Sequence, residues 1–339
     1  MAASEFPEAV TSPATPGESP QVAILLSTYN GAEFLAAQLE SFPTQTHANW
    51  VLHWRDDGSS DGSPSIVDAF AQSQQPGRCT GWPSGERLMA TRSFLCLLRH
   101  ARTTPARLFA FSDQDDVWLP IKLARGVAAL PEDRPALYCS GHILVDAALR
   151  SIGQSEPLRK PPGFLPALTQ NIAQGCTVMF NRAAADLILA IEPPPATVHD
   201  WWSYLVVTAA GGQVVADPTP SLLYRQHGAN QIGVAATWWR RGIAAMQRGR
   251  RPFMNLLRQH VRALQTRPDL LTPDTRKQLA VVARAMDGGI RARLSALRQT
   301  GFVRQTWQET AIFRLWFLLG DHAIGQLGNI VLGPTDAVR

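Results

Sequence analysis

Apolar runs of strand length recur along the first two thirds of the chain, and most are followed by a stretch with helical spacing. The first run, residues 22–26, is continuous rather than alternating, which is typical of a strand buried on both faces of a parallel sheet. The other predicted strands are 50–54, 107–112, 137–140, 142–145, 175–180, 213–216 and 221–224. The predicted helices are 34–42, 63–70, 93–101, 121–130, 183–191 and 199–210. This alternation predicts βαβ units and therefore an α/β fold with a mostly parallel sheet flanked by helices.

Three of the predicted strands are followed directly by polar residues. These are Thr28, Tyr29 and Asn30 after the first strand, Asp56 and Asp57 after the second, and Asp113, Asp115 and Asp116 after the strand at 107–112. Because the carboxyl ends of parallel strands meet at one edge of a sheet, we expect these clusters to converge on a ligand pocket. The first two clusters are also compatible with ordinary turns, which favour Asp, Asn and Gly.

The aspartates at 113–116 predict a strand-to-helix turn that needs a positive charge nearby. Carboxylates this close repel one another, so the cluster needs a cation or a firm hydrogen-bond network. Mg²⁺ or Mn²⁺ suits it, because hard cations take oxygen ligands and leave positions open for substrate phosphates. The chain has no Gly-rich phosphate loop of either common type, so metal and side chains would meet any phosphate charge. The alternative is that Asp116 is the N-cap of the next helix.

Two further residues are candidates for chemistry. Asp200 lies at the start of a predicted helix beside Trp201 and Trp202, and a carboxylate beside aromatic walls can have a raised pKa and act as a general base. A helix cap with two core tryptophans explains the same pattern. His227 lies in a turn after the last predicted strand and is either a ligand or a structural residue.

Charge divides the chain into an acidic head and a basic tail. Residues 240–339 hold 17 Arg and Lys against 6 Asp and Glu, a net charge of +11, whereas the preceding residues hold 15 against 21, a net of −6. Such asymmetry suggests that the two parts of the chain have different functions. Residues 1–20, rich in Pro, Ser and Ala, are expected to be a disordered leader.

Composition favours a cytoplasmic protein. The apolar content of 45% suffices for a large core, and no apolar run is long enough to span a bilayer. The N-terminus lacks the layout of a secretory signal. The four cysteines are scattered without ligand spacing, which favours reduced thiols over a disulfide framework or a zinc site.

Six motifs, in order, resemble those of glycosyltransferase family 2, and most closely its bacterial rhamnosyltransferase-like branch. They lie at residues 26–31, 55–61, 113–118, 171–182, 199–202 and 224–228, so the resemblance covers about residues 21–234. It implies a GT-A fold, with a Rossmann-like nucleotide-binding part at about 21–118 and an acceptor part at about 119–234. It also implies a single displacement that inverts the anomeric centre.

The resemblance assigns expected roles to residues that match the motifs. Thr28, Tyr29 and Asn30 would line the base and ribose of the donor, and Asp56, with Asp57 beside it, would contact the base. Asp113 and Asp115 match the family's DxD motif, whose second carboxylate binds the metal, and Asp200 matches the base that acts on the acceptor hydroxyl. Arg225 and His227 belong to a segment near the diphosphate, with His227 as a further candidate metal ligand.

The expected activity follows from these roles. It is an inverting, metal-dependent transfer of a sugar, with rhamnose as the branch's commonest donor sugar, from a dTDP- or UDP-sugar to a glycan or lipid-linked acceptor in bacterial surface polysaccharide synthesis. One departure is visible, because relatives usually have Asn-Leu-Gly where this chain has Arg87, Leu88 and Met89, in a loop that often touches the donor. The alternative is therefore a catalytically silent nucleotide-sugar-binding protein with the same fold.

Residues 235–339 lie outside the resemblance and are predicted to form basic amphipathic helices. One interpretation places them on the anionic inner face of the cytoplasmic membrane, with Trp238, Trp239, Trp316 and Phe317 at the interface. The other is a helical cap packed on the catalytic domain or on a second subunit. No nucleic-acid recognition motif accompanies the basic charge, so nucleic acid is not an expected partner.

Overall fold

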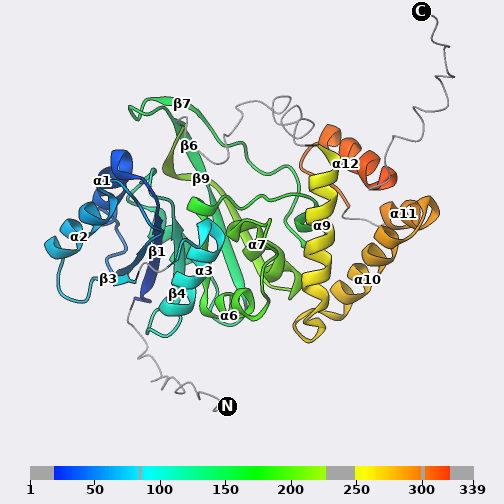
Figure 1. Ribbon diagram of the computed structural model, residues 1–339, viewed down its shortest axis with the longest axis horizontal. Coiled ribbons are helices and arrows are strands. Elements are labelled where there is room, and N and C mark those ends of the chain that lie inside the picture. Colours follow the sequence, from blue (N-terminus) through cyan, green and yellow to red (C-terminus); the bar gives the residue numbers. More distant parts are fainter. Residues whose placement is uncertain (1–18, 84–85, 227–248, 299–301, 321–339) are drawn as a thin grey trace, which may run out of the picture.

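The computed structural model describes residues 19–83, 86–226, 249–298 and 302–320. Within these ranges a curled sheet forms the centre of the molecule, and a block of helices lies at one end (Figure 1). The strand order is β3-β2-β1-β4-β8-β6-β9-β5, with β7 paired to β6. The predicted α/β class and the helical C-terminal extension are confirmed.

The first half of the sheet is parallel. Strand β1 (Val22–Thr28) lies between β2 (Trp50–Asp56) and β4 (Leu108–Ser112), and β3 (Cys79–Trp82) pairs with β2. The helices of this half are α1 (Ala32–Glu40), α2 (Ser63–Ser73) and α3 (Met89–Ala101). Ala23 and Leu25 belong to the hydrophobic cluster on one face of the sheet, and Ile24 belongs to the cluster on the other. Strand β1 is thus buried on both faces, as its continuous apolar run predicts.

The second half combines both strand directions. It contains β6 (Ala136–Val145), β7 (Ser151–Gln154), β8 (Met179–Asn181) and β9 (Gln213–Arg225), with helices α4 (Lys122–Ala129), α5 (Phe164–Thr169), α6 (Arg182–Ala190) and α7 (His199–Ala209). Strand β8 runs antiparallel to β4 and β6, whereas β9 runs parallel to β6. The two predicted strands at 137–145 are one strand, and so are the two at 213–224. The pairing between these strands shifts register at Gly141, which explains the interrupted apolar pattern.

The acidic turn differs from its prediction. A short strand, β5 (Val117–Trp118), separates the aspartates from α4 and pairs antiparallel with β9. The turn is therefore tied to the second half of the sheet instead of leading directly into a helix. The N-cap interpretation of Asp116 is wrong, because the N-cap of α4 is Ile121 and Asp116 is fully buried. Likewise, a 3-10 turn, η1 (Gly175–Thr177), precedes β8 where a strand was predicted.

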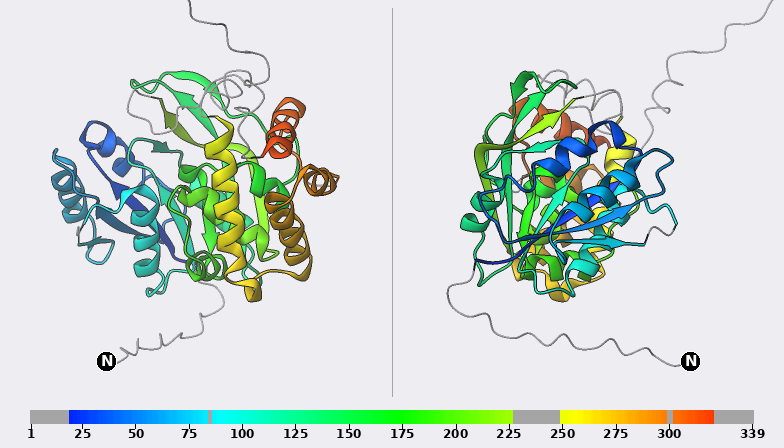
Figure 2. Two further views of the ribbon diagram at one scale, coloured as in Figure 1. Left: turned by 45° about the vertical axis from the view of Figure 1, so that its right-hand side comes forward. Right: turned by 90° about the vertical axis from the view of Figure 1, so that its left-hand side faces the viewer.

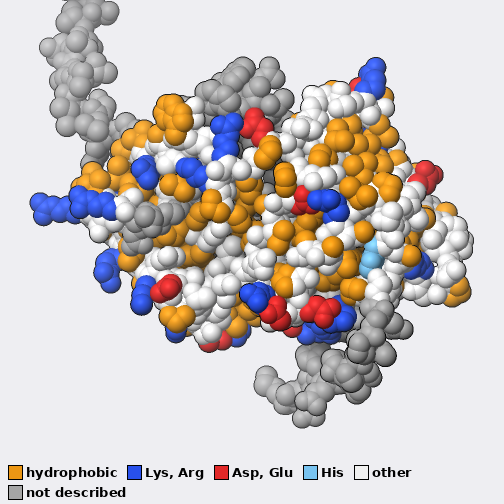
Figure 3. Space-filling view, turned by 180° about the vertical axis from the view of Figure 1, so that it is seen from behind, with side chains coloured by type: hydrophobic (Ala, Val, Ile, Leu, Met, Phe, Trp, Pro, Cys, Tyr) orange, Lys and Arg blue, Asp and Glu red, His pale blue; other side chains and the backbone are white. Residues whose placement is uncertain are grey.

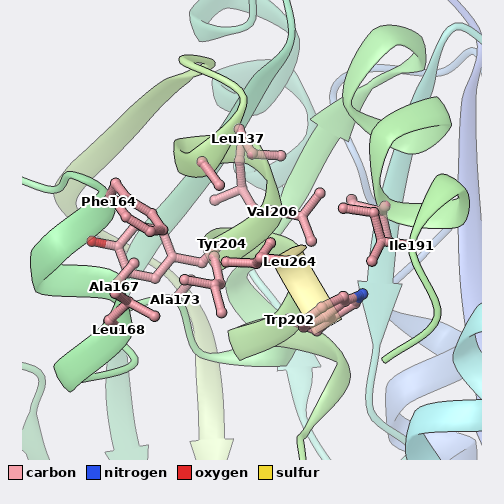
Figure 4. Packing of buried hydrophobic residues seen from close by; sticks show 14 of the residues in the cluster. Leu137, Phe164, Ala167, Leu168, Ala173, Ile191, Trp202, Tyr204, Val206 and Leu264 are labelled. Carbon is pink, nitrogen blue, oxygen red and sulfur yellow. The ribbon is translucent and has the colours of Figure 1, made fainter. Parts of the chain in front are cut away.

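The C-terminal extension packs on the catalytic part of the chain. It comprises α9 (Arg250–Gln265), the 3-10 turn η2 (Pro268–Leu270), α10 (Pro273–Asp287), α11 (Ile290–Leu297) and α12 (Trp307–Leu319). Figure 2 shows α9, in yellow, lying over the green helices of the second half. In Figure 4, Leu264 of α9 lies among Trp202 and Tyr204 of α7, and all three belong to one buried cluster. The prediction of a helical cap on the catalytic domain is confirmed for these helices.

The membrane interpretation needs correction at one residue. Phe317 is 1% exposed and packs in the core, so it cannot enter a membrane interface. Trp316 is half-buried, and Trp238 and Trp239 lie outside the described residues. No helix in the part of the chain that the structure describes combines enough length with enough apolar character to cross a bilayer.

Phe313 provides a test of this shared core. Its ring is fully buried and lies 5.4 Å from Phe302 and 5.8 Å from Phe317, measured between ring centroids. We expect Phe313→Ala to lower the free energy of unfolding by about 3–5 kcal/mol, because a buried ring leaves a cavity behind. Leu315→Ala, on the exposed side of the same helix, should change it by no more than about 0.5 kcal/mol. Denaturant unfolding measures both, and equal losses would contradict the burial of Phe313 in this core.

Candidate active site

One cavity of about 1190 Å³ gathers most of the residues that the sequence predicted as site residues. Its lining includes Thr28, Tyr29, Asn30, Asp57, Asp113, Asp115 and Asp200. The carboxyl end of β1 and the loops after β1, β2 and β4 supply the first six, as expected from the shared edge of a parallel sheet, and the start of α7 supplies Asp200. Asp56 and Arg225 are buried and lie outside this lining, and His227 lies outside the described residues.

Asp56 holds a turn together. Its carboxylate accepts hydrogen bonds from the backbone N–H of Gly58 at 3.0 Å and of Ser59 at 2.8 Å, and from the hydroxyl of Thr28 at 2.9 Å. These bonds occupy both carboxylate oxygens and support the turn interpretation of this residue. Asp57, in contrast, lines the cavity.

The loop before α3 is fastened to Asp57. The Asp57 carboxylate accepts hydrogen bonds from the backbone N–H groups of Leu88 at 2.7 Å and Met89 at 2.8 Å, and it pairs with the buried guanidinium of Arg55 at 2.5 Å. The guanidinium of Arg87 lies 3.9 Å from the centre of the Tyr29 ring, a cation–π contact at the cavity wall. Arg87 was not predicted as a site residue, because its contact with Tyr29 joins positions 58 apart in the sequence.

Met89 has a left-handed backbone, with φ of 63°. This is the conformation that glycine adopts freely, and it accounts for the glycine of the Asn-Leu-Gly pattern at this place. Strain of this kind costs on the order of 1–3 kcal/mol. We therefore expect Met89→Gly to raise the free energy of unfolding by up to about 1 kcal/mol, because relief of strain exceeds the added entropy of the unfolded chain.

The matched control is Ala90→Gly, at the next position inside α3. Here φ is not left-handed, so glycine relieves no strain and only adds entropy to the unfolded chain. The free energy of unfolding should therefore fall by about 1 kcal/mol. Loss of stability in both variants would contradict strain at Met89.

Gln114 ties the acidic turn to the first strand. Its side-chain oxygen accepts from the backbone N–H of Tyr29 at 2.8 Å, and its side-chain nitrogen donates to the Tyr29 carbonyl at 3.0 Å. The amide lies so close to Gly31 that a Cβ there would stand 2.3 Å from its carbon. Glycine at position 31 is therefore required for this close approach, and the two loops are held in one arrangement.

The aspartates of the turn have unequal surroundings. Asp113 is half-buried at the cavity wall, where burial, and then the like charges of Asp115 and Asp200, raise its pKa to about 8. Asp116 lies in the interior and its pKa is raised well above the ordinary value, mainly by burial. One of its carboxylate oxygens accepts from the backbone N–H of Arg225 at 3.2 Å, and the other has no hydrogen-bond partner among the described residues.

Lys122 lies close to Asp113 and Asp116 in the interior of the protein. It is fully buried, its ammonium donates to the carbonyl of Cys176 at 2.8 Å, and burial lowers its pKa to about 8. Its charge acts against the raised pKa of Asp113. The lysine offsets only part of the repulsion within the turn, because the pKa of Asp113 and of Asp116 stays raised beside it. No role for Lys122 could be predicted from the sequence, because a lysine in an amphipathic helix is expected to face solvent.

The donor set fits a hard divalent cation. Ligand atoms of Asp113, Asp116 and Cys176 lie within 4.8 Å of one another. Burial raises the pKa of the Cys176 thiol well above its ordinary value, so the sulfur stays protonated and is a poor, soft ligand for Mg²⁺ or Mn²⁺. Carboxylate oxygens are the appropriate ligands, and Asp113 and Asp115 face the cavity where a substrate phosphate could complete the coordination.

Arg225 supports the turn from behind. Its side chain donates to the carbonyl of Asp115 at 2.8 Å and to that of Ala147 at 2.5 Å. The guanidinium also lies 4.6 Å from the centre of the Phe34 ring. The contacts named here fix the backbone of the acidic turn, and the location near the diphosphate that the resemblance implies for this segment stays a prediction.

Asp200 lies in the first turn of α7, near enough to Asp113 for its charge to raise the pKa of that carboxyl. One carboxylate oxygen accepts from the backbone N–H of Gly175 at 2.8 Å and the other from that of Trp201 at 2.6 Å. Burial raises its pKa to about 6, and the hydrogen bonds from Trp201, Gly175 and Asn171 act in the other direction. The helix-cap interpretation is wrong, because the N-cap is Val198. Trp202 does pack in the core, but Trp201 lines the cavity.

The fold is of the GT-A type. Among solved structures, residues 1–349 of TarS from S. aureus, in complex with UDP-GlcNAc, superpose with a TM-score of 0.52 at 12% identity, over 88% of this chain and 91% of that one. At this identity the likeness concerns the fold alone.

Sequence comparison identifies the family of one domain, which spans about half of the chain. The family model of glycosyl transferase family 2 matches residues 23–188, and the chain carries a domain of this family and is a glycosyltransferase. A dTDP-rhamnosyl transferase, RfbG of Shigella flexneri, is 28% identical over 61% of this chain and 73% of its own. WfgD of Escherichia coli, a UDP-Glc:alpha-D-GlcNAc-diphosphoundecaprenol beta-1,3-glucosyltransferase, is 30% identical over 32% of this chain and 40% of its own.

Proposed function

We propose that this glycosyltransferase moves a sugar from a nucleoside-diphosphate donor to a hydroxyl of a glycan or lipid-linked acceptor in bacterial surface polysaccharide synthesis, with inversion and with a divalent cation. The observation that carries the proposal is the placement of a buried carboxylate of raised pKa, Asp200, in the same cavity as the acidic turn. The likeness to a dTDP-rhamnosyl transferase supports dTDP-rhamnose as the first donor to test, with UDP-sugars next.

The residues divide the reaction between them. Tyr29, Arg87 and Asp57 form the wall for the nucleoside, and Asp113 with Asp115 would hold the cation. When bound, the cation would neutralise the diphosphate as it leaves. Asp200 takes the proton from the acceptor hydroxyl as the oxygen forms its bond to the anomeric carbon and the bond from that carbon to the diphosphate oxygen breaks. Attack opposite to the leaving diphosphate inverts the centre.

A donor panel tests the proposal. Purified protein with Mg²⁺ or Mn²⁺ is titrated with dTDP-rhamnose, UDP-glucose, UDP-GlcNAc and GDP-mannose, and release of nucleoside diphosphate is followed with and without surface-polysaccharide fragments as acceptors. We expect one donor to bind more tightly than the rest and to release its diphosphate faster when acceptor is present. Binding without release under any condition would instead support a silent nucleotide-sugar-binding protein.

We also propose that the outer side of the extension meets an anionic membrane surface from the cytoplasmic side. Large apolar side chains are exposed there: Ile290, Leu294, Leu315 and Leu319. Arg291 and Arg314 are exposed on the same helices, Arg298 is exposed directly after α11, and Figure 3 shows Lys and Arg side chains among apolar ones at this end of the molecule. Each basic residue near such a surface contributes about 1 kcal/mol. Flotation with anionic vesicles should show binding that weakens with salt, and indifference to anionic vesicles at low salt would refute it.

A further inference from the structure

The cavity does not end at Asp200. It continues to a wall made by two helices of the C-terminal extension, which are far from the family domain in the sequence. Phe253 and Leu256 lie one turn apart on α9, and Glu309, Ile312 and Trp316 follow the i, i+3, i+7 spacing of a single face of α12. We call this wall, with Gln170 at its edge, the α9/α12 wall.

The chemistry of the α9/α12 wall is aromatic at its centre and polar at its edge. The rings of Phe253 and Trp316 lie 5.9 Å apart, measured between centroids. The side-chain nitrogen of Gln170 lies 3.4 Å from both carboxylate oxygens of Glu309. A flat aromatic surface beside amide and carboxylate groups is what recognises a saccharide, because the C–H face of a sugar ring packs on the aromatic ring while its hydroxyls form hydrogen bonds.

This wall is held firmly in place. The side-chain oxygen of Gln305 accepts from the backbone N–H groups of Arg159 at 2.8 Å and Lys160 at 3.1 Å, and its side-chain nitrogen donates to the Lys160 carbonyl at 3.1 Å. The backbone N–H of Gln305 donates in turn to Gln170 at 2.9 Å. The extension is thereby fastened to the loop before α5, and a preformed site of this kind loses little entropy on binding.

The volume of the cavity and the charge of its lining limit which ligands the wall can bind. A cavity of about 1190 Å³ exceeds the range of about 300–1,000 Å³ that is usual for one small ligand, so it has room for donor and acceptor together. Among the described lining residues at the end of the α9/α12 wall, Arg304 is the single cation. The aromatic, amide and carboxylate groups of the wall suit a neutral sugar ring.

We propose that the α9/α12 wall is a second acceptor subsite, which takes a sugar unit one place beyond the sugar whose hydroxyl is deprotonated by Asp200. The acceptor is accordingly an oligosaccharide of at least two units. This proposal rests on the proposed function, because it takes the Asp200 end of the cavity as the place of transfer.

The test uses saccharides of one, two and three units, prepared by partial acid hydrolysis of the source organism's surface polysaccharide. Each is titrated by calorimetry against the protein saturated with UDP or dTDP. We expect the two-unit fragment to bind at least about tenfold more tightly than the one-unit fragment, a factor that corresponds to about 1.4 kcal/mol. Trp316→Ala should remove this difference, and Trp316→Phe, which keeps a flat ring, should retain most of it.

Trp307→Ala is the matched control, because Trp307 is on the same helix, is 74% exposed and is not part of the cavity lining. If the Trp316 and Trp307 variants prefer the two-unit fragment over the one-unit fragment to the same extent, the proposal is overturned. If substitution of Trp316 weakens the binding of an isoprenyl phosphate but not of saccharides, the wall is a lipid site and the proposal is overturned. Thermal unfolding and binding of the nucleoside diphosphate identify misfolded variants. Failure of donor turnover would refute the proposed function. The preference for the two-unit fragment is measured by binding, so its result does not depend on turnover.

Discussion

Asp200→Asn is expected to lower kcat by about 10²–10⁴-fold, the usual contribution of a general base. The amide cannot take a proton, but its oxygen can still accept the hydrogen bond from Gly175 that the carboxylate accepts now. Donor affinity should therefore stay close to that of the wild type, whereas loss of the hydrogen bond from the Trp201 N–H should lower the free energy of unfolding by about 0.5–1.5 kcal/mol. Initial-rate measurements at saturating donor, with calorimetric titration of the nucleoside diphosphate, separate loss of chemistry from loss of binding.

The pH dependence gives an independent view of the same carboxyl. Burial raises the pKa of Asp200 to about 6, and only the deprotonated form can act as a base. Activity should accordingly rise about tenfold per pH unit below 6 and level off above it. A cation at Asp113 favours the carboxylate and should move the inflection to lower pH. Asp274→Asn, at a side chain that is 86% exposed, should keep the wild-type profile. An unchanged rate in Asp200→Asn would rule out this residue as the base.

Removal of divalent cations should lower turnover by at least about 100-fold. A cation at a leaving diphosphate contributes several kcal/mol, and each 1.4 kcal/mol is about tenfold in rate. Because the pKa of Asp113 is raised to about 8 in the free protein, cation binding should displace a proton and tighten as pH increases from about 6 to 8. Turnover after chelation, followed by return of Mg²⁺ or Mn²⁺, measures the first effect, and calorimetry in buffers of different ionisation enthalpy measures the second.

Variants of the acidic turn identify the ligands. Asp113→Asn and Asp115→Asn should each abolish the rise in unfolding temperature that Mn²⁺ causes in the wild type, since a cation that binds only the folded state stabilises it. Cys176→Ala should keep that rise, because the buried thiol is protonated. If Cys176→Ala loses the effect while the Asp115 variant keeps it, the cation is held by Asp113, Asp116 and Cys176 instead.

The convergence of the loops after β1, β2 and β4 could be predicted because it depends on the local apolar pattern and on one general property of parallel sheets. Continuous apolar runs identify β1, β2 and β4 as buried parallel strands, and parallel strands place their carboxyl ends together. That was sufficient to bring Tyr29, Asp57 and Asp113 into one cavity. The acidic turn was less predictable, because β5 is only two residues long and its existence depends on pairing with β9, about a hundred residues later.

Residues that act through tertiary contacts could not be predicted. Lys122 lies in a helix whose spacing is that of an ordinary amphipathic surface helix, yet its ammonium is buried under the acidic turn. The amphipathic pattern of the tail predicted its helices but not what their apolar faces contact, because burial against a core and burial against lipid select the same side chains. Met89 is the exception, since a methionine where relatives have glycine was visible in the sequence, and its left-handed backbone explains that glycine.

The packing of Leu264 against Trp202 and Tyr204 affects how such enzymes can be recombined. The motif resemblance predicts that the catalytic domain ends near residue 234. By that boundary alone, the tail could be exchanged between relatives to alter acceptor choice. A chimera joined there would place a foreign α9 on a native α7, at a surface where side-chain volumes must match closely. Exchange of acceptor preference should therefore succeed only when α5 and α7 are transplanted together with the tail, and natural recombination between such genes should have its crossovers before α5.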